Sequence, residues 1–99
     1  NNGEYWLIHA GMEYFSESRR LEEYSVEELV WKRTDFDITY FKNITVVSGH
    51  TPTQNILGNS RPGYIFKKNN YIAIDCGAGK NSGRLAAICL DTGEEYYAE

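Results

Sequence analysis

The chain has 99 residues, of which 41% are hydrophobic and 24% are charged, an ordinary composition for one small globular domain. The formal net charge is -4, and the basic residues occur only in brief pairs, so no basic stripe indicates a DNA or RNA partner. No hydrophobic run approaches the length of a membrane span and no signal peptide is visible, so we expect no membrane partner and a cytoplasmic location.

The chain opens with Asn1, Asn2 and Gly3, which are typical of a turn, and without a methionine. A strand pattern follows at once over residues 4–9, and residues 10–21 are expected to form a loop. We therefore expect the chain to start at a loop within a larger domain.

The clearest local signal is a helix start at Ser25. Ser25 and Glu28 have the spacing of a capping box, in which the serine hydroxyl accepts from the Glu28 amide and the Glu28 carboxylate accepts from the Ser25 amide. The expected helix has two to three turns, with Lys32 and Arg33 in the last one. A further short helix is one interpretation of residues 36–41.

The rest of the chain has the pattern of short strands. Residues 68–70 are expected to form a hairpin turn between two of them. The order predicts an α/β fold, with one βαβ-like unit followed by an antiparallel meander. That meander cannot cover both faces of the sheet, so another segment must do so. The expected strands are residues 44–48, 64–67, 71–74, 84–90 and 95–98.

The only two histidines of the chain occupy the same setting. His9 and His50 each end an apolar, β-favouring run and are followed by residues that permit a turn. A βαβ connection makes its two strands parallel, and both imidazoles would then lie at one edge of the sheet, within reach of one metal ion. A single histidine in this place is more often structural, but two in identical settings favour a metal site.

Other candidate chemistry is weaker. Asp75 also follows an apolar run and could be a third ligand, although a turn in which it accepts from the Gly77 amide is at least as good an interpretation. Arg33 could hold a phosphate as a bidentate fork, and the alternative is a solvated helix end. The glycine-rich residues 77–83 lack the P-loop pattern and are expected to form a hairpin connection.

The two cysteines carry little functional signal. Cys76 and Cys89 do not fit a cysteine-based zinc site. A disulfide between them stays open, but buried free thiols suit a reducing compartment better. Cys76 could be a nucleophile only beside a histidine base, and nothing in the sequence indicates that it is activated.

Four blocks in order resemble the calcineurin-like metallophosphoesterases. LIHAG at residues 7–11 resembles the family's VHAG motif, and VSGHTPT at residues 47–53 is similar to its GHTP motif. Trp31 and Arg33 match a Trp-x-Arg segment between them. IAIDCG at residues 72–77 and GRLAA at residues 83–87 are similar to the IDTGA and GGRLTAL blocks of bacterial members.

The resemblance implies a four-layer α/β/β/α sandwich with a dinuclear metal centre between its sheets. Residues 1–99 would be the C-terminal portion of that single domain. It also implies hydrolysis of phosphoric esters by metal-activated water, with two divalent ions, most readily manganese and alternatively iron or zinc. His9 and His50 would bind the same one of the two metals.

The family's other motifs, which supply the remaining metal ligands and the general acid, do not occur here. We therefore expect this segment to lack a catalytic residue, to be inactive alone and to need the N-terminal half of the same domain. The expected substrate is a phosphorylated protein, as for serine/threonine phosphatases, or a dinucleoside polyphosphate, as for symmetrical diadenosine tetraphosphate hydrolases. An interpretation from another class is a non-catalytic binding or regulatory fragment that keeps the fold.

Overall fold

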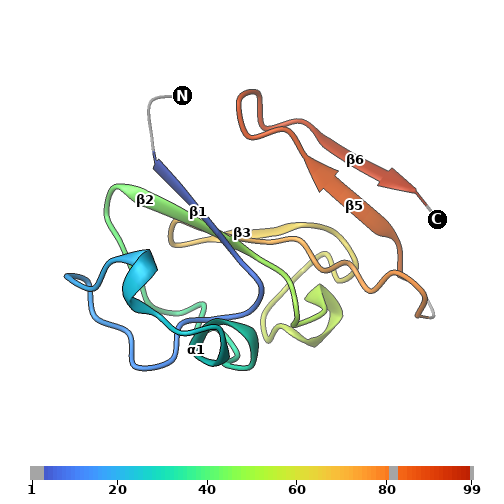
Figure 1. Cartoon of the computed structure of the whole chain (residues 1–99). Coiled ribbons are helices and arrows are strands. Elements are labelled where there is room, and N and C mark those ends of the chain that lie inside the picture. Colours follow the sequence, from blue (N-terminus) through green and yellow to red (C-terminus); the bar gives the residue numbers. More distant parts are fainter. Residues whose placement is uncertain (1–3, 81–82, 99) are drawn as a thin grey trace.

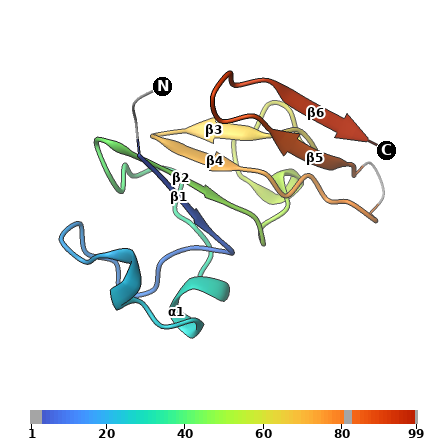
Figure 2. The same cartoon turned by 45° about the horizontal axis from the view of Figure 1, so that its top comes forward.

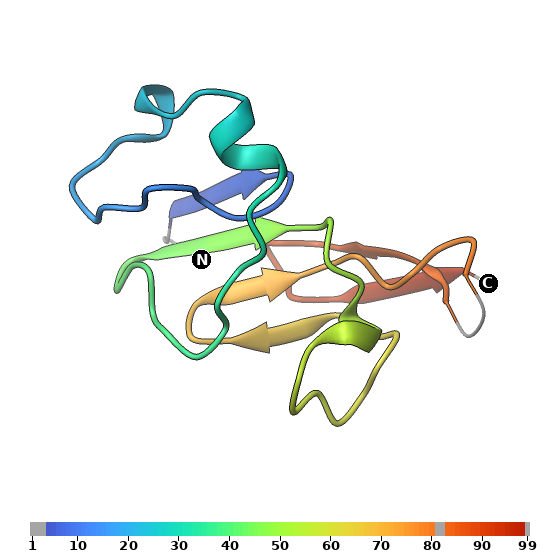
Figure 3. The same cartoon turned by 90° about the horizontal axis from the view of Figure 1, so that it is seen from below.

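The computed structural model describes residues 4–80 and 83–98, and its main element is a mixed four-stranded sheet. The strand order is β1-β2-β4-β3, with β1 parallel to β2, β2 parallel to β4, and β3 antiparallel to β4 (Figure 3). The bounds are Glu4–Ile8 for β1, Ile44–Ser48 for β2, Phe66–Lys68 for β3 and Tyr71–Ala73 for β4. The expected βαβ-like unit is therefore confirmed, because β1 and β2 are parallel neighbours joined by a segment that contains the α-helix.

The expected single meander is wrong. β3 and β4 form one hairpin, while β5 (Leu85–Ile88) and β6 (Glu95–Ala98) form a separate two-stranded antiparallel sheet (Figure 1). The β3–β4 turn contains Asn69 at φ 54° and Asn70 at φ 61°, the left-handed pair that a tight two-residue hairpin turn requires. β4 uses its other edge to pair with β2, so it extends the parallel sheet and leaves no edge for β5.

One face of the main sheet packs on the segment between β1 and β2. Trp6, Val46 and Tyr71 lie in register across the three parallel strands, and all three are buried. They pack with side chains from the covering segment, namely Met12, Tyr24, Tyr40 and Phe41. Alternation along a strand sends every second residue to the same face, so this row defines the first core.

The opposite face packs on the β5–β6 hairpin. Val47 and Ile72 point to this side and contact Ala86 and Tyr97 of the hairpin. Figures 1 and 2 show α1 and the hairpin on opposite sides of the main sheet. The hairpin covers this face only in part, because Leu7 of β1 remains 64% exposed. The architecture is a small α/β domain of three layers, and a four-layer sandwich is not formed by the described residues.

The helix start is confirmed, but the helix is shorter than expected. The Glu28 amide donates to the Ser25 hydroxyl at 3.3 Å, and the Ser25 amide donates to the Glu28 carboxylate at 2.8 Å. The α-helix α1 nevertheless covers only Glu27–Val30. The carbonyls of Leu29 and Lys32 instead accept from the amides of the chain that follows β1, so tertiary hydrogen bonds replace another helical turn.

The stretch from residue 36 to residue 41 is a turn and not a helix. The Asp35 carboxylate accepts from the Asp37 amide, and the Asp35 amide donates to the Tyr40 hydroxyl, so side chains satisfy the local backbone groups. The described residues also contain two short 3-10 helices, η1 at Leu21–Glu23 and η2 at Thr53–Asn55. Within the described ranges, no helix is long and apolar enough to cross a membrane.

Candidate metal centre

The two histidines lie side by side at the carboxyl ends of β1 and β2. Ile8 and Ser48 are the last paired residues of the two strands, and the Gly49 amide donates to the His9 carbonyl at 3.0 Å just beyond them. The imidazole centroids of His9 and His50 are 5.2 Å apart, with 55° between the ring planes. The expectation that the strands are parallel neighbours and bring both histidines to one edge is confirmed.

The backbone at His50 is unusual. Its φ of 71° lies in the left-handed region, which side chains other than glycine seldom adopt. This conformation turns the chain sharply after β2. Residues held in this region cost of order 1 kcal/mol or more and cluster at functional sites.

A buried tyrosine connects the two histidine loops. The Tyr71 hydroxyl donates to the Ala10 carbonyl at 3.0 Å, directly after His9. Its oxygen also lies 2.6 Å from the Ser48 hydroxyl and 2.7 Å from the Thr34 hydroxyl. Since a phenol has one proton, both hydroxyls must donate to it. Burial raises the pKa of Tyr71, so the phenol stays protonated.

The loop after His9 is fixed by a close backbone contact. The Ala10 amide donates to the Leu29 carbonyl at 2.8 Å, and the Gly11 amide donates to the Lys32 carbonyl at 2.7 Å. A β-carbon on Gly11 would lie 2.7 Å from that same Lys32 carbonyl oxygen, which is closer than carbon and oxygen can approach. Only glycine fits this position, so the His-Ala-Gly sequence is explained by packing of the loop on the segment after α1.

Both histidines line a hollow of about 360 Å³ between the edge of the main sheet and the β5–β6 hairpin. Asp75, Cys76 and Arg84 line it as well. One Asp75 carboxylate oxygen accepts from the Gly77 amide at 3.0 Å, so the turn interpretation of Asp75 is confirmed. Within residues 4–80 and 83–98, no group of three or more His, Cys, Asp or Glu side chains is placed to hold a metal ion. The described residues therefore bring the two histidines together without a third side chain of this kind beside them.

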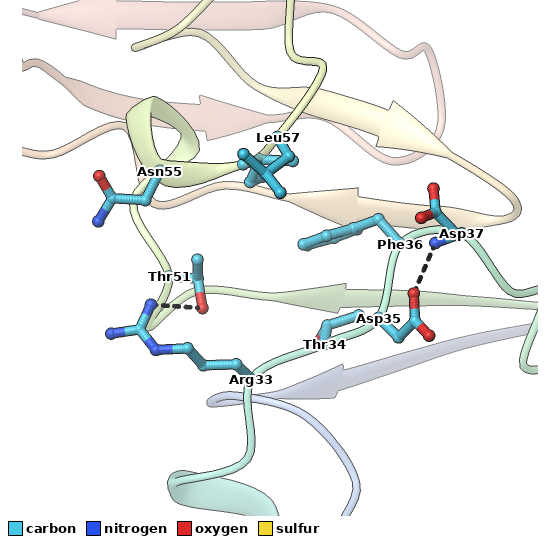
Figure 4. A pocket seen from close by; sticks show the side chains of 9 residues that line it. Arg33, Thr34, Asp35, Phe36, Asp37, Thr51, Asn55 and Leu57 are labelled. Atoms are coloured by element: carbon cyan, nitrogen blue, oxygen red, sulfur yellow. Dashed lines mark hydrogen bonds between the residues drawn. The ribbon is translucent and has the colours of Figure 1, made fainter.

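Two residues of the segment after α1 lie next to His50. The Trp31 indole meets the His50 ring edge-on at a centroid distance of 6.1 Å, although Trp31 is 71% exposed. Arg33 is exposed, and its guanidinium donates to the Thr51 hydroxyl at 3.4 Å (Figure 4). Thr51 directly follows His50. The three residues singled out from the sequence, His9, His50 and Arg33, are thus brought to the same edge of the sheet.

Comparisons with protein-family models, with curated proteins and with solved structures found no match to this chain.

Cys76, the cysteine beside the histidines, is not activated as a nucleophile. Cys76 and Cys89 are both free, as expected, with Cys76 buried and Cys89 partly exposed. Cys76 shares the hollow with the histidines, but burial raises the pKa of its thiol. A protonated thiol is a poor nucleophile, so Cys76 is not activated for thiol chemistry in this hollow. Part of the expected connection at residues 77–83, namely Asn81 and Ser82, lies outside the described residues.

Sequence reasoning missed the connecting role of Tyr71 and the place of Arg84 in the wall of the hollow. A tyrosine that begins a buried strand must find partners for its hydroxyl, and this is the signal that points to Tyr71. No local pattern identifies Arg84. Its guanidinium stacks over the Tyr64 ring at 4.1 Å and donates to the Gly63 carbonyl at 3.0 Å, and both contacts depend on the tertiary fold.

Proposed function

We propose that this chain contributes half of a metal centre to a phosphoric ester hydrolase, most closely a serine/threonine phosphatase. The observation that carries the proposal is the 5.2 Å separation of the His9 and His50 rings at the ends of adjacent parallel strands. The carboxyl ends of parallel strands are where open α/β folds place their ligands.

The separation of the rings fits two ligands of one metal ion. A metal–nitrogen bond of about 2 Å puts each imidazole centroid about 3 Å from the metal, so two rings in tetrahedral geometry have centroids about 5 Å apart. His9 is exposed and His50 is partly exposed, so an ion can reach both from solvent. Neutral imidazoles suit iron or zinc, whereas manganese would need oxygen ligands beside them, and His9 and His50 would bind one ion of a pair.

The neighbouring residues suit a phosphate ester. Arg33 lies beside Thr51, and a guanidinium can hold two phosphate oxygens at once. It would orient the phosphoryl group next to the histidines, where the Trp31 indole lies edge-on to the His50 ring. When bound, the metal pair supplies a water with a lowered pKa and neutralises charge on the phosphoryl oxygens.

A catalytic centre needs more than this chain provides. Catalytic metal sites use three or more protein ligands with an open position, and the described residues provide two. The remaining ligands and the general acid would have to come from other groups, which we propose lie in an N-terminal half of the same domain. Two free cysteines are consistent with a cytoplasmic location for the whole protein.

The test is hydrolysis by the intact protein that carries this chain. With manganese added, we expect it to hydrolyse p-nitrophenyl phosphate and phosphothreonine peptides. His9→Ala and His50→Ala should each lower kcat/KM by about 100-fold or more and release bound metal, because each removes a direct ligand. Asp75→Asn keeps the turn acceptor and is the control, with activity within a few-fold of the parent.

The outcomes separate the alternatives. Metal binding that depends on both histidines without hydrolysis of any phosphate ester would favour the non-catalytic binding class. Cleavage of diadenosine tetraphosphate with no cleavage of phosphopeptides would favour the dinucleotide substrate. Full activity and full metal content in both histidine variants would refute the metal-ligand assignment.

A further inference from the structure

A second pocket lies beside the edge of the sheet that carries His9 and His50. Arg33 and Thr51 line one end of it. Its volume is about 240 Å³, and it is bounded by residues 33–37 on one side and by the loop around η2 on the other. Figure 4 places Arg33 and Thr51 at one end of the pocket and Asp35 and Asp37 at the other. The pocket therefore continues away from the place where Arg33 would hold a phosphate.

The far end of the pocket is acidic. Asp37 forms an ion pair with Lys68 at 3.0 Å, but the two side chains are 85% and 48% exposed, so solvent weakens this pair. One oxygen of Asp35 accepts from the Asp37 amide at 3.0 Å. Among the described residues, no cation pairs with Asp35. This end of the pocket thus carries a carboxylate whose charge is not balanced by the chain.

The middle of the pocket is apolar and has one firm wall. Phe36 meets the Phe66 ring at 5.3 Å and the Tyr71 ring at 5.2 Å, both edge-on, so its ring is held in place. Leu57 lies across the pocket from Phe36 and is 96% exposed (Figure 4). A long aliphatic stem could pack between Phe36 and Leu57 while a charged head reaches the carboxylates.

We propose that this pocket selects phosphorylated peptides that carry a lysine or arginine near the phosphorylated residue. The phosphate would lie at the Arg33 end, the stem of the basic side chain between Phe36 and Leu57, and its cation at Asp35 and Asp37. The negative phosphate would then face the positive end of the pocket, and the positive side chain would face its negative end. A glutamate at the same peptide position would be repelled by the two carboxylates. The inference rests on the proposed phosphatase function, whose substrate class it specifies.

The experiment measures kcat/KM of the intact protein on a series of phosphothreonine peptides. One lysine is moved from three positions before the phosphothreonine to three after it in an alanine background, with glutamate counterparts. We expect the best lysine peptide to exceed the all-alanine peptide by about fivefold, the scale of a partly exposed ion pair. The preference should shrink as ionic strength rises.

Variants locate the effect in the pocket. Asp35→Asn keeps an oxygen for the Asp37 amide but removes the charge, and it should reduce the lysine preference to less than about twofold. Asp37→Asn should reduce it less, because Lys68 already shares that carboxylate. Asp91→Asn, at an exposed position outside this pocket, is the matched control and should keep the full preference. Hydrolysis of p-nitrophenyl phosphate by Asp91→Asn should equal that of the parent.

Each outcome supports or overturns the pocket inference. Activity on p-nitrophenyl phosphate with equal kcat/KM for lysine, alanine and glutamate peptides would overturn the pocket inference and leave the proposed function intact. The same holds if Asp35→Asn keeps the lysine preference. Cleavage of diadenosine tetraphosphate alone would overturn both the pocket inference and the assignment to serine/threonine phosphatases. Absence of hydrolysis of every phosphate ester would overturn the proposed function and this inference with it.

Discussion

The Tyr71 hydroxyl donates to the Ala10 carbonyl at 3.0 Å, and through this bond the middle of the sheet holds the loop that carries His9. The same oxygen accepts from Ser48, two residues before His50. One buried side chain therefore fixes both histidine loops relative to each other. In the proposed metal site, the fold would hold this pair in place before a metal binds, which would lower the entropy cost of binding.

Tyr71→Phe should weaken both stability and metal binding. It removes one donor and two acceptor sites, and it leaves the Ala10 carbonyl and the Ser48 hydroxyl buried without their partner, at a cost of about 1–3 kcal/mol in unfolding free energy. Urea unfolding and calorimetric titration with Mn²⁺ on the intact protein measure the two effects.

Tyr24→Phe is the control for this substitution. Tyr24 is also buried at 8% exposure, but its hydroxyl has no hydrogen-bond partner among the described residues. Removing that hydroxyl should leave stability unchanged or raise it by about 1 kcal/mol. Equal losses in both variants would contradict the connecting role of Tyr71.

Gly11→Ala should destabilise the protein because the new methyl would lie 2.7 Å from the Lys32 carbonyl oxygen. The loop or the segment after α1 must shift, at a cost of about 1–3 kcal/mol, and His9 should move with it. Gly49→Ala is the control, since Gly49 also lies close to a histidine, directly before His50. Its β-carbon would find its nearest atoms at 3.8 Å, so thermal unfolding should be almost unchanged. A Gly11→Ala variant as stable as Gly49→Ala would show that the loop is free to move.

The edge of the sheet that carries the histidines was predictable from the sequence. The apolar runs before His9 and His50 have strand character, and a helix between two strands makes them parallel neighbours. Both strands are local sequence patterns, and the rule for βαβ crossovers is enough to place them side by side. The capping box at Ser25 was predictable for the same reason, because its two hydrogen bonds span only three residues.

The features that the sequence did not predict depend on partners that are distant in sequence. The helix ends at Val30 because the carbonyls of Glu28 and Leu29, which would accept from a further helical turn, accept instead from the loop after β1. Helix propensity alone does not predict this competition. The role of Tyr71 depends on Ala10, which is 61 positions away. The pocket between Arg33 and Asp35 exists because η2 folds over them, and no spacing in the sequence encodes that contact.

Acid should loosen the attachment of the β5–β6 hairpin through Glu95. A hydrogen bond from the Tyr97 hydroxyl and the ion pair with Lys67 at 3.0 Å hold the pKa of Glu95 below its ordinary value of 4.5. A carboxylate whose pKa is lowered by folding stabilises the fold above its unfolded pKa, and this contribution is lost as pH falls through the folded pKa.

The urea midpoint should therefore fall more steeply below about pH 4.5 in the parent than in Glu95→Gln, which has no charge to lose. Glu94→Gln, at the neighbouring exposed position, should follow the parent profile. Parallel profiles for the parent and Glu95→Gln would show that this carboxylate does not couple hairpin attachment to pH.

His50→Gly should separate metal binding from backbone strain. At φ 71°, glycine is favoured over any residue with a side chain, so His50→Gly should be more stable than His50→Ala by about 1 kcal/mol without metal. Both variants lose the imidazole and should lose metal equally. His9 does not lie in the left-handed region, so the order should reverse there, with His9→Gly less stable than His9→Ala by about 1 kcal/mol. Unfolding measured in EDTA tests the four variants, and a His50→Gly variant less stable than His50→Ala would mean that the left-handed turn at residue 50 carries no strain.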